Sequence, residues 1–208
     1  MTPKISLKCG SKDDLRTLNF QFDLLKRKIG VLVSGGLDSA LLYYLVQSLA
    51  NEKYSVVPFI INRDNDGSDL YAQPVIDFIH KSLNKPLQTA IELAINEKNS
   101  DLQVSAGMKL LDTYPVNIVY IGLIETLPIH SIGVAKPFTP VDNNKFVYPF
   151  KNLNKSHIVD LVNQLDLHEL FKITHSCVYK NYRCNHCNRC NERHWAFTKL
   201  NLVDPGTR

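Results

Sequence analysis

The sequence lacks the features that mark membrane-spanning, fibrous and disordered proteins. Its 208 residues contain no run of about 20 apolar residues, the length that a helix needs to cross a bilayer, and no basic, apolar leader. They contain no internal repeat and no low-complexity tract. With 44% hydrophobic and 21% charged residues, the composition is that of a globular protein. We therefore expect a soluble, cytoplasmic protein with one sizeable core and no membrane association.

The sequence also lacks a strong charge of either sign. Lys and Arg number 24 and Asp and Glu number 20, which leaves a net charge of +4. Part of the basic excess lies in the C-terminal third, at Lys172, Lys180, Arg183, Arg189 and Arg193. A solvated surface explains so small an excess better than a nucleic-acid interface does, so we expect no direct nucleic-acid binding.

Cysteine is scarce outside one short segment. Cys9 is alone near the start of the chain, and we expect it to be a small buried hydrophobic residue. The other four, Cys177, Cys184, Cys187 and Cys190, lie close together near the end. In a reducing compartment such a cluster favours metal binding over disulfides.

Residues 29–46 predict the central element of the fold. Residues 29–33 form an apolar run, which is typical of a strand buried on both faces of a parallel sheet. The sequence SGGLDS follows at 34–39, and residues 40–49 then have the apolar spacing of a helix. A strand, a glycine-rich turn and a helix N-terminus direct backbone N–H groups at one point, so we expect an anion there rather than an ordinary turn. The loop is neither a Walker loop, because no Lys follows the second glycine, nor a GxGxxG dinucleotide loop.

The rest of the chain alternates between strand and helix patterns. We expect strands at 54–61, 86–95 and 116–124, helices at 70–83, 101–113, 157–165 and 191–200, and a hairpin or edge strands within 1–28. Ser156 is the expected cap of the helix at 157–165, and 127–148 reads as a long functional loop. Arg63 and Asp64 follow the second core strand and face either a nucleotide or solvent. This alternation predicts an α/β fold with a doubly wound parallel sheet and helices on both faces.

The cysteine spacing predicts a closed metal site. Cys184, Cys187 and Cys190 form two overlapping CxxC pairs, and Cys177 supplies a fourth thiolate. Four thiolates complete the tetrahedral shell of structural zinc, which leaves no open position for catalysis. An iron–sulfur cluster with the same ligands is the alternative. His186 and His194 are spare ligands that the four cysteines make unnecessary.

With these two motifs, the sequence resembles the 7-cyano-7-deazaguanine synthase (QueC) family of the N-type ATP pyrophosphatase, or PP-loop, superfamily. Four segments between residues 29 and 199 carry the resemblance. SGGLDS at 34–39 matches the family's SGGxDS, and IGLIET at 121–126 resembles its GVxET. The region around Lys155 resembles its P-x-x-x-x-x-K helix, and THSC followed by CxxCxxC resembles its zinc site.

The resemblance implies an adenine nucleotide alpha hydrolase-like fold, with residues 1–170 as the ATP-pyrophosphatase-like domain and 171–208 as a C-terminal zinc knuckle. It implies an ATP-dependent carbon–nitrogen ligase that adenylates 7-carboxy-7-deazaguanine and uses ammonia to form the 7-cyano product. Its cofactors would be ATP, Mg²⁺ and Zn²⁺, with Asp38 holding the magnesium and Asp38, Ser39 and Glu125 as the catalytic residues. The implied ATP-binding residues are Val33, Ser34, Gly35, Gly36, Leu37, Asp38, Ser39, Ala40, Leu41, Leu42 and Tyr43. The sequence does not decide between a monomer and a homodimer.

The acceptor half of the sequence departs from the family. The family carries an SGYPDC-like stretch after GVxET, whereas this chain reads LPIHSIG from Leu127, and the family's Gly-Arg-Asn segment has no counterpart within 99–112. A related carboxylate is therefore an alternative acceptor. A tRNA thiolase is a second alternative, but it needs a cysteine to carry sulfur. A zinc-knuckle module that binds RNA or protein is a third, and it leaves the SGGLDS loop unexplained.

Overall fold

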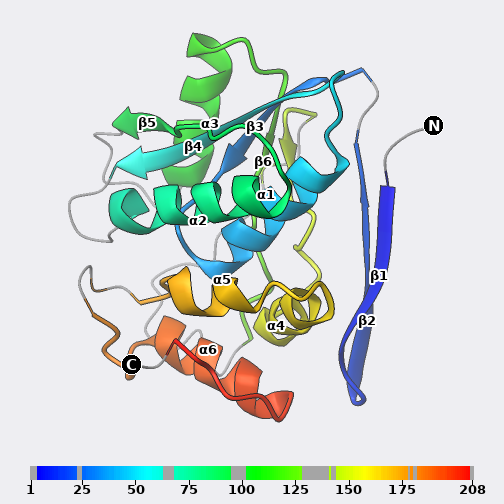
Figure 1. The fold of residues 1–208 in the computed structure, drawn as a ribbon, viewed down its shortest axis with the longest axis vertical. Helices are drawn as coiled ribbons and strands as arrows, with labels where there is room; N and C mark the ends of the chain where they lie inside the picture. The colour runs from blue at the N-terminus through cyan, green and yellow to red at the C-terminus, as the bar shows by residue number, and fades with distance from the viewer. Residues whose placement is uncertain are drawn as a thin grey trace.

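The computed structural model describes residues 4–22, 25–62, 68–94, 102–127, 141, 144–177, 179 and 182–206. Its centre is a five-stranded parallel sheet in the order β5-β4-β3-β6-β7 (Figure 1). The strands are β3 (Lys28–Leu32), β4 (Ser55–Asn62), β5 (Ile91–Ala94), β6 (Ile118–Tyr120) and β7 (Phe146–Val147). The chain runs from β3 outward to β4 and β5 on one side, then returns to place β6 and β7 on the other. This confirms the predicted doubly wound topology, with its switch point between β3 and β6.

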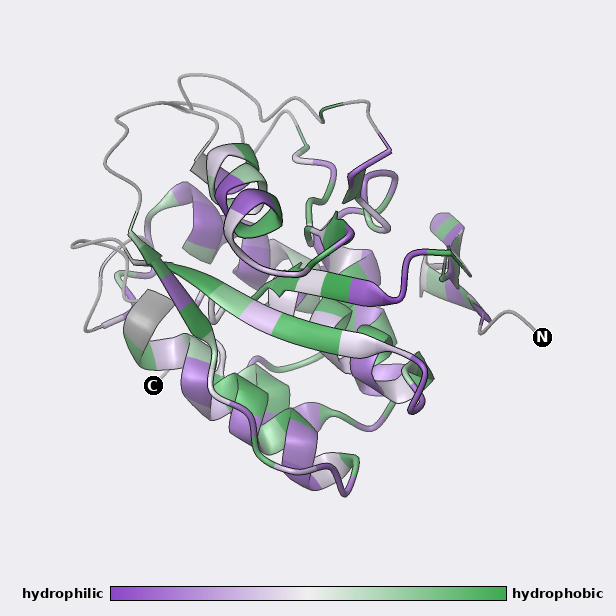
Figure 2. Ribbon diagram, turned by 90° about the horizontal axis from the view of Figure 1, so that it is seen from above, coloured by the Kyte–Doolittle hydropathy of each residue, from purple (hydrophilic) through white to green (hydrophobic). Residues whose placement is uncertain are grey.

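Helices cover both faces of the sheet, because alternate side chains of each strand point to opposite faces. Val31 and Ile60 belong to the hydrophobic cluster that includes α1 (Leu37–Leu49) and α2 (Ser68–Ser82). Leu32 and Phe59 belong to a second cluster, under α3 (Leu102–Thr113). Hydrophobic residues accordingly dominate the strands at the centre of Figure 2, and polar residues are frequent on the surrounding helices.

The C-terminal helices extend the first cluster. They are α4 (Lys155–Gln164), α5 (His168–Ile173) and α6 (Asn188–Lys199), which lie together on one side of the molecule (Figure 1). The rings of Phe171 and Phe197 meet edge to face, with centroids 4.8 Å apart, and both residues belong to the same core as Val33. The division into domains 1–170 and 171–208 therefore stays a prediction, because this core joins residues from both.

A separate hairpin precedes the sheet. Strands β1 (Lys4–Ser11) and β2 (Asp14–Gln21) pair only with each other, in an antiparallel two-stranded sheet beside α4 (Figure 1). This confirms the predicted hairpin, whereas the alternative of edge strands in the main sheet is wrong. Cys9, Leu18 and Phe20 are buried and join the main core, as expected of Cys9.

Several predicted boundaries were wrong. The strand expected at 116–124 is limited to Ile118–Tyr120, because the chain leaves the sheet at Gly122 to pass the start of α1. The loop expected at 127–148 contains β7, whose two residues are too few to show a pattern in sequence. Helix α5 was not predicted as a separate element, and Asn154 caps α4 in place of Ser156.

No helix in the described part of the chain is both long and apolar enough to cross a membrane.

Candidate functional site

The loop after β3 has a backbone that requires glycine. Gly35 adopts φ +76°, in the left-handed region, and a Cβ added there would lie 2.5 Å from the Cβ of Tyr71. Its carbonyl oxygen accepts a hydrogen bond of 2.9 Å from the backbone N–H of His175. The turn is therefore held between α2 and the segment that leads to the cysteine cluster.

Two serines fix the rest of the loop. The backbone N–H of Ser34 donates to Ser39 Oγ over 3.0 Å, and Ser39 Oγ donates to the carbonyl of Gly36 over 3.0 Å. Gly36 occupies the N-cap position of α1 and has no side chain with which to cap the helix. The first N–H groups of a helix have no intrahelical partner, so the start of α1 offers them to an anion.

A buried lysine adds positive charge to this anion site. Lys155 is the first residue of α4, and its Nζ lies 2.6 Å from both carboxylate oxygens of Asp38. The Lys155 side chain is only 5% exposed and that of Asp38 is 23% exposed. Asn154 sets the position of Lys155 because its side chain accepts the Ser156 N–H and caps α4. The geometry thus pairs the predicted magnesium ligand with a cation that can move to a phosphate.

Glu192 on α6 lies close enough to Lys155 and Asp38 for both charges to affect the pKa of its carboxyl group. Burial raises the pKa of its carboxyl group and Asp38 raises it further, whereas Lys155 and Arg189 lower it. Neither Lys155 nor Glu192 was among the predicted site residues. Lys155 had a signal in sequence, the P-x-x-x-x-x-K pattern that ends with it, but Glu192 had none.

Many of the predicted ATP-binding residues are part of the hydrophobic core next to the loop. Val33, Leu37, Ala40, Leu41, Leu42 and Tyr43 are fully buried. The hydroxyl of Tyr43 lies 2.7 Å from His80 Nε2 and accepts a hydrogen bond of 2.8 Å from Gln47. Only backbone atoms of these six residues could contact a nucleotide, so their assignment as binding residues stays a prediction.

Glu125 follows β6 on the other side of the switch point. A Cβ added at Gly122 would lie 3.1 Å from the backbone of Asp38, so the segment after β6 passes directly beside the start of α1. The backbone N–H of Glu125 donates to the carbonyl of Leu153 over 2.8 Å. Its carboxylate is 44% exposed and pairs with Arg16. Arg63, Asp64 and residues 128–133, the rest of the divergent LPIHSIG stretch, lie outside the described residues.

The four clustered cysteines meet as the spacing predicted. The sulfur atoms of Cys177, Cys184, Cys187 and Cys190 all lie within 4.8 Å of one another. Backbone N–H groups donate to two of them, from Cys184 to Cys177 Sγ and from Cys187 to Cys184 Sγ. Loss of solvent opposes ionisation of Cys184, but N–H groups of His186 and Cys187 lower the pKa of its thiol to about 6. His186 is exposed and lies outside the group.

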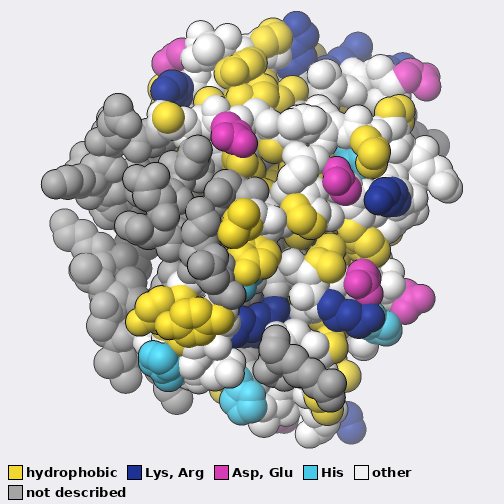
Figure 3. All heavy atoms as spheres, turned by 60° about the vertical axis from the view of Figure 1, so that its left-hand side comes forward, with side chains coloured by type: hydrophobic (Ala, Val, Ile, Leu, Met, Phe, Trp, Pro, Cys, Tyr) yellow, Lys and Arg dark blue, Asp and Glu magenta, His cyan; other side chains and the backbone are white. Residues whose placement is uncertain are grey.

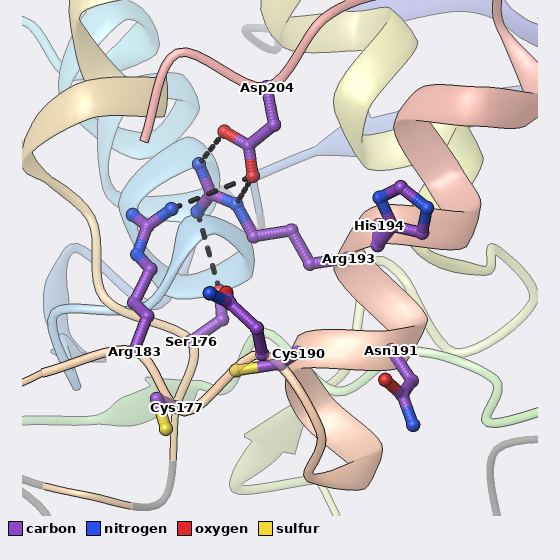
Figure 4. Close-up of a pocket in the computed structure, with 9 residues that line it drawn as sticks. Ser176, Cys177, Arg183, Cys190, Asn191, Arg193, His194 and Asp204 are labelled. Carbon is purple, nitrogen blue, oxygen red and sulfur yellow. Dashed lines mark hydrogen bonds and ion pairs between the residues drawn. The ribbon is translucent and has the colours of Figure 1, made fainter. Parts of the chain in front are cut away.

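A buried ion-pair network lies directly behind the cysteines (Figure 4). Arg193 on α6 donates to Asp204 Oδ2 and Oδ1 over 2.5 and 2.8 Å, and Arg183 Nη1 lies 3.5 Å from the same carboxylate. A cavity of about 250 Å³ separates this network from Cys177 and Cys190. The C-terminal tail is thereby attached to the segment that carries the cysteines.

The surface near the cysteines carries two exposed aromatic side chains. Tyr179 and Tyr182 are 43% and 59% exposed, and their rings stack with centroids 5.2 Å apart. On the face in Figure 3, hydrophobic side chains lie beside histidine, lysine and arginine side chains. The absence of direct nucleic-acid binding stays a prediction.

Comparisons with known proteins agree with the resemblance seen in the motifs. The family model described as "Queuosine biosynthesis protein QueC" matches residues 86–201, which is more than half of the chain. The match begins after the Ser34 loop, so the interpretation of that loop rests on its own sequence and geometry. A search of the curated proteins found no match.

Two solved structures are similar in part. One is an NH3-dependent NAD synthetase from Campylobacter jejuni in complex with nitrate, with 22% identity over 69% of this chain and a TM-score of 0.42. This chain spans 66% of that protein's length. The other is the U34-tRNA thiolase NcsA from Methanococcus maripaludis with its [4Fe-4S] cluster, with 13% identity over 89% of this chain and 70% of that one and a TM-score of 0.48. Neither carries a conclusion about the activity of this chain.

Proposed function

The chain belongs to the queuosine biosynthesis protein QueC family, and from this membership we propose that it is an ATP-dependent carbon–nitrogen ligase whose acceptor is 7-carboxy-7-deazaguanine. The observation that carries the proposal is the anion site at the switch point, where the N-terminus of α1 and Lys155 converge beside Asp38. Such a site suits the phosphates of ATP. Family membership supports ATP use, and the acceptor is the finer part of the proposal.

The proposed reaction begins with adenylation. An acceptor carboxylate oxygen attacks the α-phosphorus of ATP, and the bond to pyrophosphate breaks. Ammonia then attacks the acyl carbon and displaces AMP, and loss of one proton gives the amide. The amide oxygen attacks the α-phosphorus of a second ATP and pyrophosphate leaves, after which loss of AMP and of both N–H protons gives the nitrile. The chain supplies positioning and charge rather than a covalent nucleophile.

Each side chain of the loop has a proposed task. Backbone N–H groups of α1 and the Ser34 hydroxyl bind the leaving pyrophosphate, and the Ser39 hydroxyl joins them by exchanging its hydrogen bond to the Gly36 carbonyl for one to a phosphate oxygen. Lys155 donates to a phosphate oxygen once Asp38 is released from it. Magnesium, when bound through Asp38, would neutralise phosphate charge. Glu125 accepts a hydrogen bond from an N–H group of the acceptor or of ammonia.

Zinc is the proposed metal of the cysteine cluster. Four thiolates bound tetrahedrally at about 2.3 Å from one zinc ion lie about 3.8 Å apart. The sulfur of Cys177 lies 3.5 Å from that of Cys184 and 3.9 Å from that of Cys187, and Cys184 and Cys190 are 4.0 Å apart. In a [4Fe–4S] cluster each thiolate binds a different iron, which requires larger separations. The spacing therefore supports a single metal ion, and zinc is the ion that four thiolates hold in structural sites.

The thiolase alternative lacks a free cysteine in a suitable place. Cys9 is the one cysteine outside the cluster, and it is fully buried on strand β1 of the N-terminal hairpin. Burial and the negative charge of Asp160 raise the pKa of its thiol to about 11. A thiol in that state is a poor nucleophile and does not reach an adenylated base.

The decisive experiment combines the protein with 7-carboxy-7-deazaguanine, ATP, Mg²⁺ and ammonium. We expect AMP and pyrophosphate to form together with a nitrile that mass spectrometry detects. Asp38→Ala should abolish pyrophosphate release, and Asp112→Ala, at an exposed aspartate of α3, should not. The segment after Thr126 differs from that of the family, so we expect the protein to use 7-carboxy-7-deazaguanine weakly or to prefer a related carboxylate. The same assay with a panel of related carboxylates tests this. Absence of AMP with every carboxylate would refute the proposed activity.

A further inference from the structure

The N-terminal hairpin contacts Glu125 through one side chain, that of Arg16. Arg16 on β2 donates from Nη1 to Glu125 Oε2 over 2.5 Å and to the carbonyl oxygen of Asn152 over 2.7 Å. Its Nε donates to Asp14 Oδ1 over 2.8 Å. The guanidinium thus joins three segments that are distant in sequence: the hairpin, the chain after β6 and the chain before α4.

The same contacts continue to the phosphate loop. Asp14 Oδ2 accepts a hydrogen bond of 3.0 Å from Asn154 Nδ2, and Asn154 is the cap of α4. The next residue is Lys155, which pairs with Asp38. An unbroken path of contacts therefore connects the two predicted catalytic carboxylates, and it passes through the hairpin.

Glu125 needs such a partner in order to hold one orientation. Its carboxylate is 44% exposed, and a side chain that solvent surrounds to this extent samples several rotamers. The planar guanidinium of Arg16 fixes it, because Asp14 and Asn152 hold that guanidinium in place. Glu125 Oε1 makes no hydrogen bond to any described residue, so it is free to accept one from a ligand.

We propose that Arg16 is a positioning residue for Glu125, and that the hairpin β1–β2 is thereby part of the site that binds the acceptor. Arg16 binds Oε2 and leaves Oε1 to accept an N–H of the acceptor or of ammonia. The inference rests on the proposed function and deepens it. The hairpin lies outside residues 86–201, so family membership assigns it no role.

The test separates binding of ATP from use of the acceptor. Arg16→Gln should leave the Kd for a non-hydrolysable ATP analogue within about twofold, because the loop is untouched. It should lower kcat/KM for the acceptor or for ammonium about tenfold, the effect of one lost charge-assisted hydrogen bond. Arg16→Lys keeps the charge but not the fork and should recover part of the loss. Lys12→Gln is the control, because this exposed lysine at the hairpin turn carries the same charge.

A double-mutant cycle distinguishes positioning from a merely structural role. In the Glu125→Ala background, Arg16→Gln should change kcat/KM less than twofold, because the hydrogen-bond acceptor that it positions is gone. An equal effect in both backgrounds, or none in the wild-type background, would overturn the inference. If Arg16→Gln does not fold, Arg16→Lys replaces it in the cycle with the same criterion. A wild-type protein that forms no AMP overturns the proposed function and the inference together, whereas an active wild type with an equally active Arg16→Gln overturns the inference alone.

Discussion

The proposed site has a loop side, which binds phosphates, and an acceptor side, and the two are built in different ways. The loop side consists of the SGGLDS segment and Lys155, and its ion pair is 5% and 23% exposed. The proposed acceptor side consists of Glu125 and Arg16, which are 44% and 31% exposed and come from the segment after β6 and from the hairpin. Phosphate binding needs fixed N–H groups, which one short buried turn supplies. An exposed pair between distant segments holds its side chains less firmly, and Glu125 lies two residues before Leu127, where the sequence begins to depart from its family.

The largest expected effect comes from the cysteine cluster, which supports the loop side. Cys187→Ser should lower Tm by about 10 °C or more, because metal-binding energy is also folding energy. It should also weaken ATP binding, because His175, two residues before Cys177, donates its N–H to Gly35. Calorimetry, metal analysis and titration with an ATP analogue measure the three quantities.

Metal analysis of the purified protein tests the zinc assignment itself. Purified wild-type protein should contain about one zinc per chain, and iron with a visible charge-transfer absorption would refute zinc. Cys9→Ala is the control, because Cys9 lies outside the cluster and its loss should leave the metal content unchanged.

Asp204→Asn is expected to have the next largest effect. Asp204 and Arg193 have side chains only 4% and 3% exposed, and removal of one partner leaves an uncompensated buried charge. The expected loss of stability is about 3 kcal/mol, or a Tm lower by roughly 10 °C. Asp166→Asn, at a side chain 91% exposed, should change Tm by less than about 2 °C. An equal Tm for both variants would show that the tail does not stabilise the cysteine segment.

The sequence predicted what depends on neighbouring residues. The SGGLDS turn and the CxxC pairs are local patterns, and the structure places them as expected, with the sulfur atoms together and Gly35 in a left-handed turn. The alternation of strands and helices likewise predicted the parallel sheet. The strand order and the hairpin's position depend on packing between distant segments, which a single sequence does not record.

The residues that were missed are those whose roles arise from distant contacts. Arg16 lies 109 positions from Glu125, and Glu192 is distant in sequence from Asp38. Strand β7 was missed because two residues show no periodicity, and its pairing with β6 is what places it. The cap of α4 was predicted two residues too late, because Asn154 and Ser156 are both good capping residues.

Lys155→Gln compares the two sides directly. Loss of Lys155 removes the cation at the phosphates and leaves Asp38 without its buried partner, so kcat/KM for ATP should fall about 100-fold. The effect should exceed that of Arg16→Gln about tenfold, because the loop-side pair is the more buried one. Steady-state pyrophosphate release measures both. Equal losses of kcat/KM in the two variants would show that the more buried Lys155–Asp38 pair contributes no more than the exposed Arg16–Glu125 pair.

The smallest expected effect is a pH dependence that belongs to the acceptor side. His157 is fully buried between α4 and the hairpin, where its ring Nε2 lies 3.0 Å from the carbonyl oxygen of Asp14. Its Nδ1 lies 3.1 Å from the backbone nitrogen and 2.8 Å from Oδ1 of Asn154. The hydrogen bond from the Asn154 N–H to Nδ1 requires the neutral ring. Burial lowers the pKa of His157 below its usual 6.5, and the nearby Arg16 contributes in the same direction against Asp14.

The sign of the effect follows from proton linkage. Below pH 6.5 the unfolded chain binds a proton that the folded one does not, so stability is complete above that pH and is lost as pH falls through the lowered pKa. Thermal unfolding of wild type should therefore show Tm falling as pH drops below 6.5, well above the range in which Asp14, whose pKa lies below 3.8, loses its charge. His157→Gln should flatten this slope without abolishing it, because burial also lowers the pKa of His175. His168→Gln, at an exposed ring, should leave the slope unchanged. A slope equal in wild type and His157→Gln would show that the hairpin does not depend on the neutral ring.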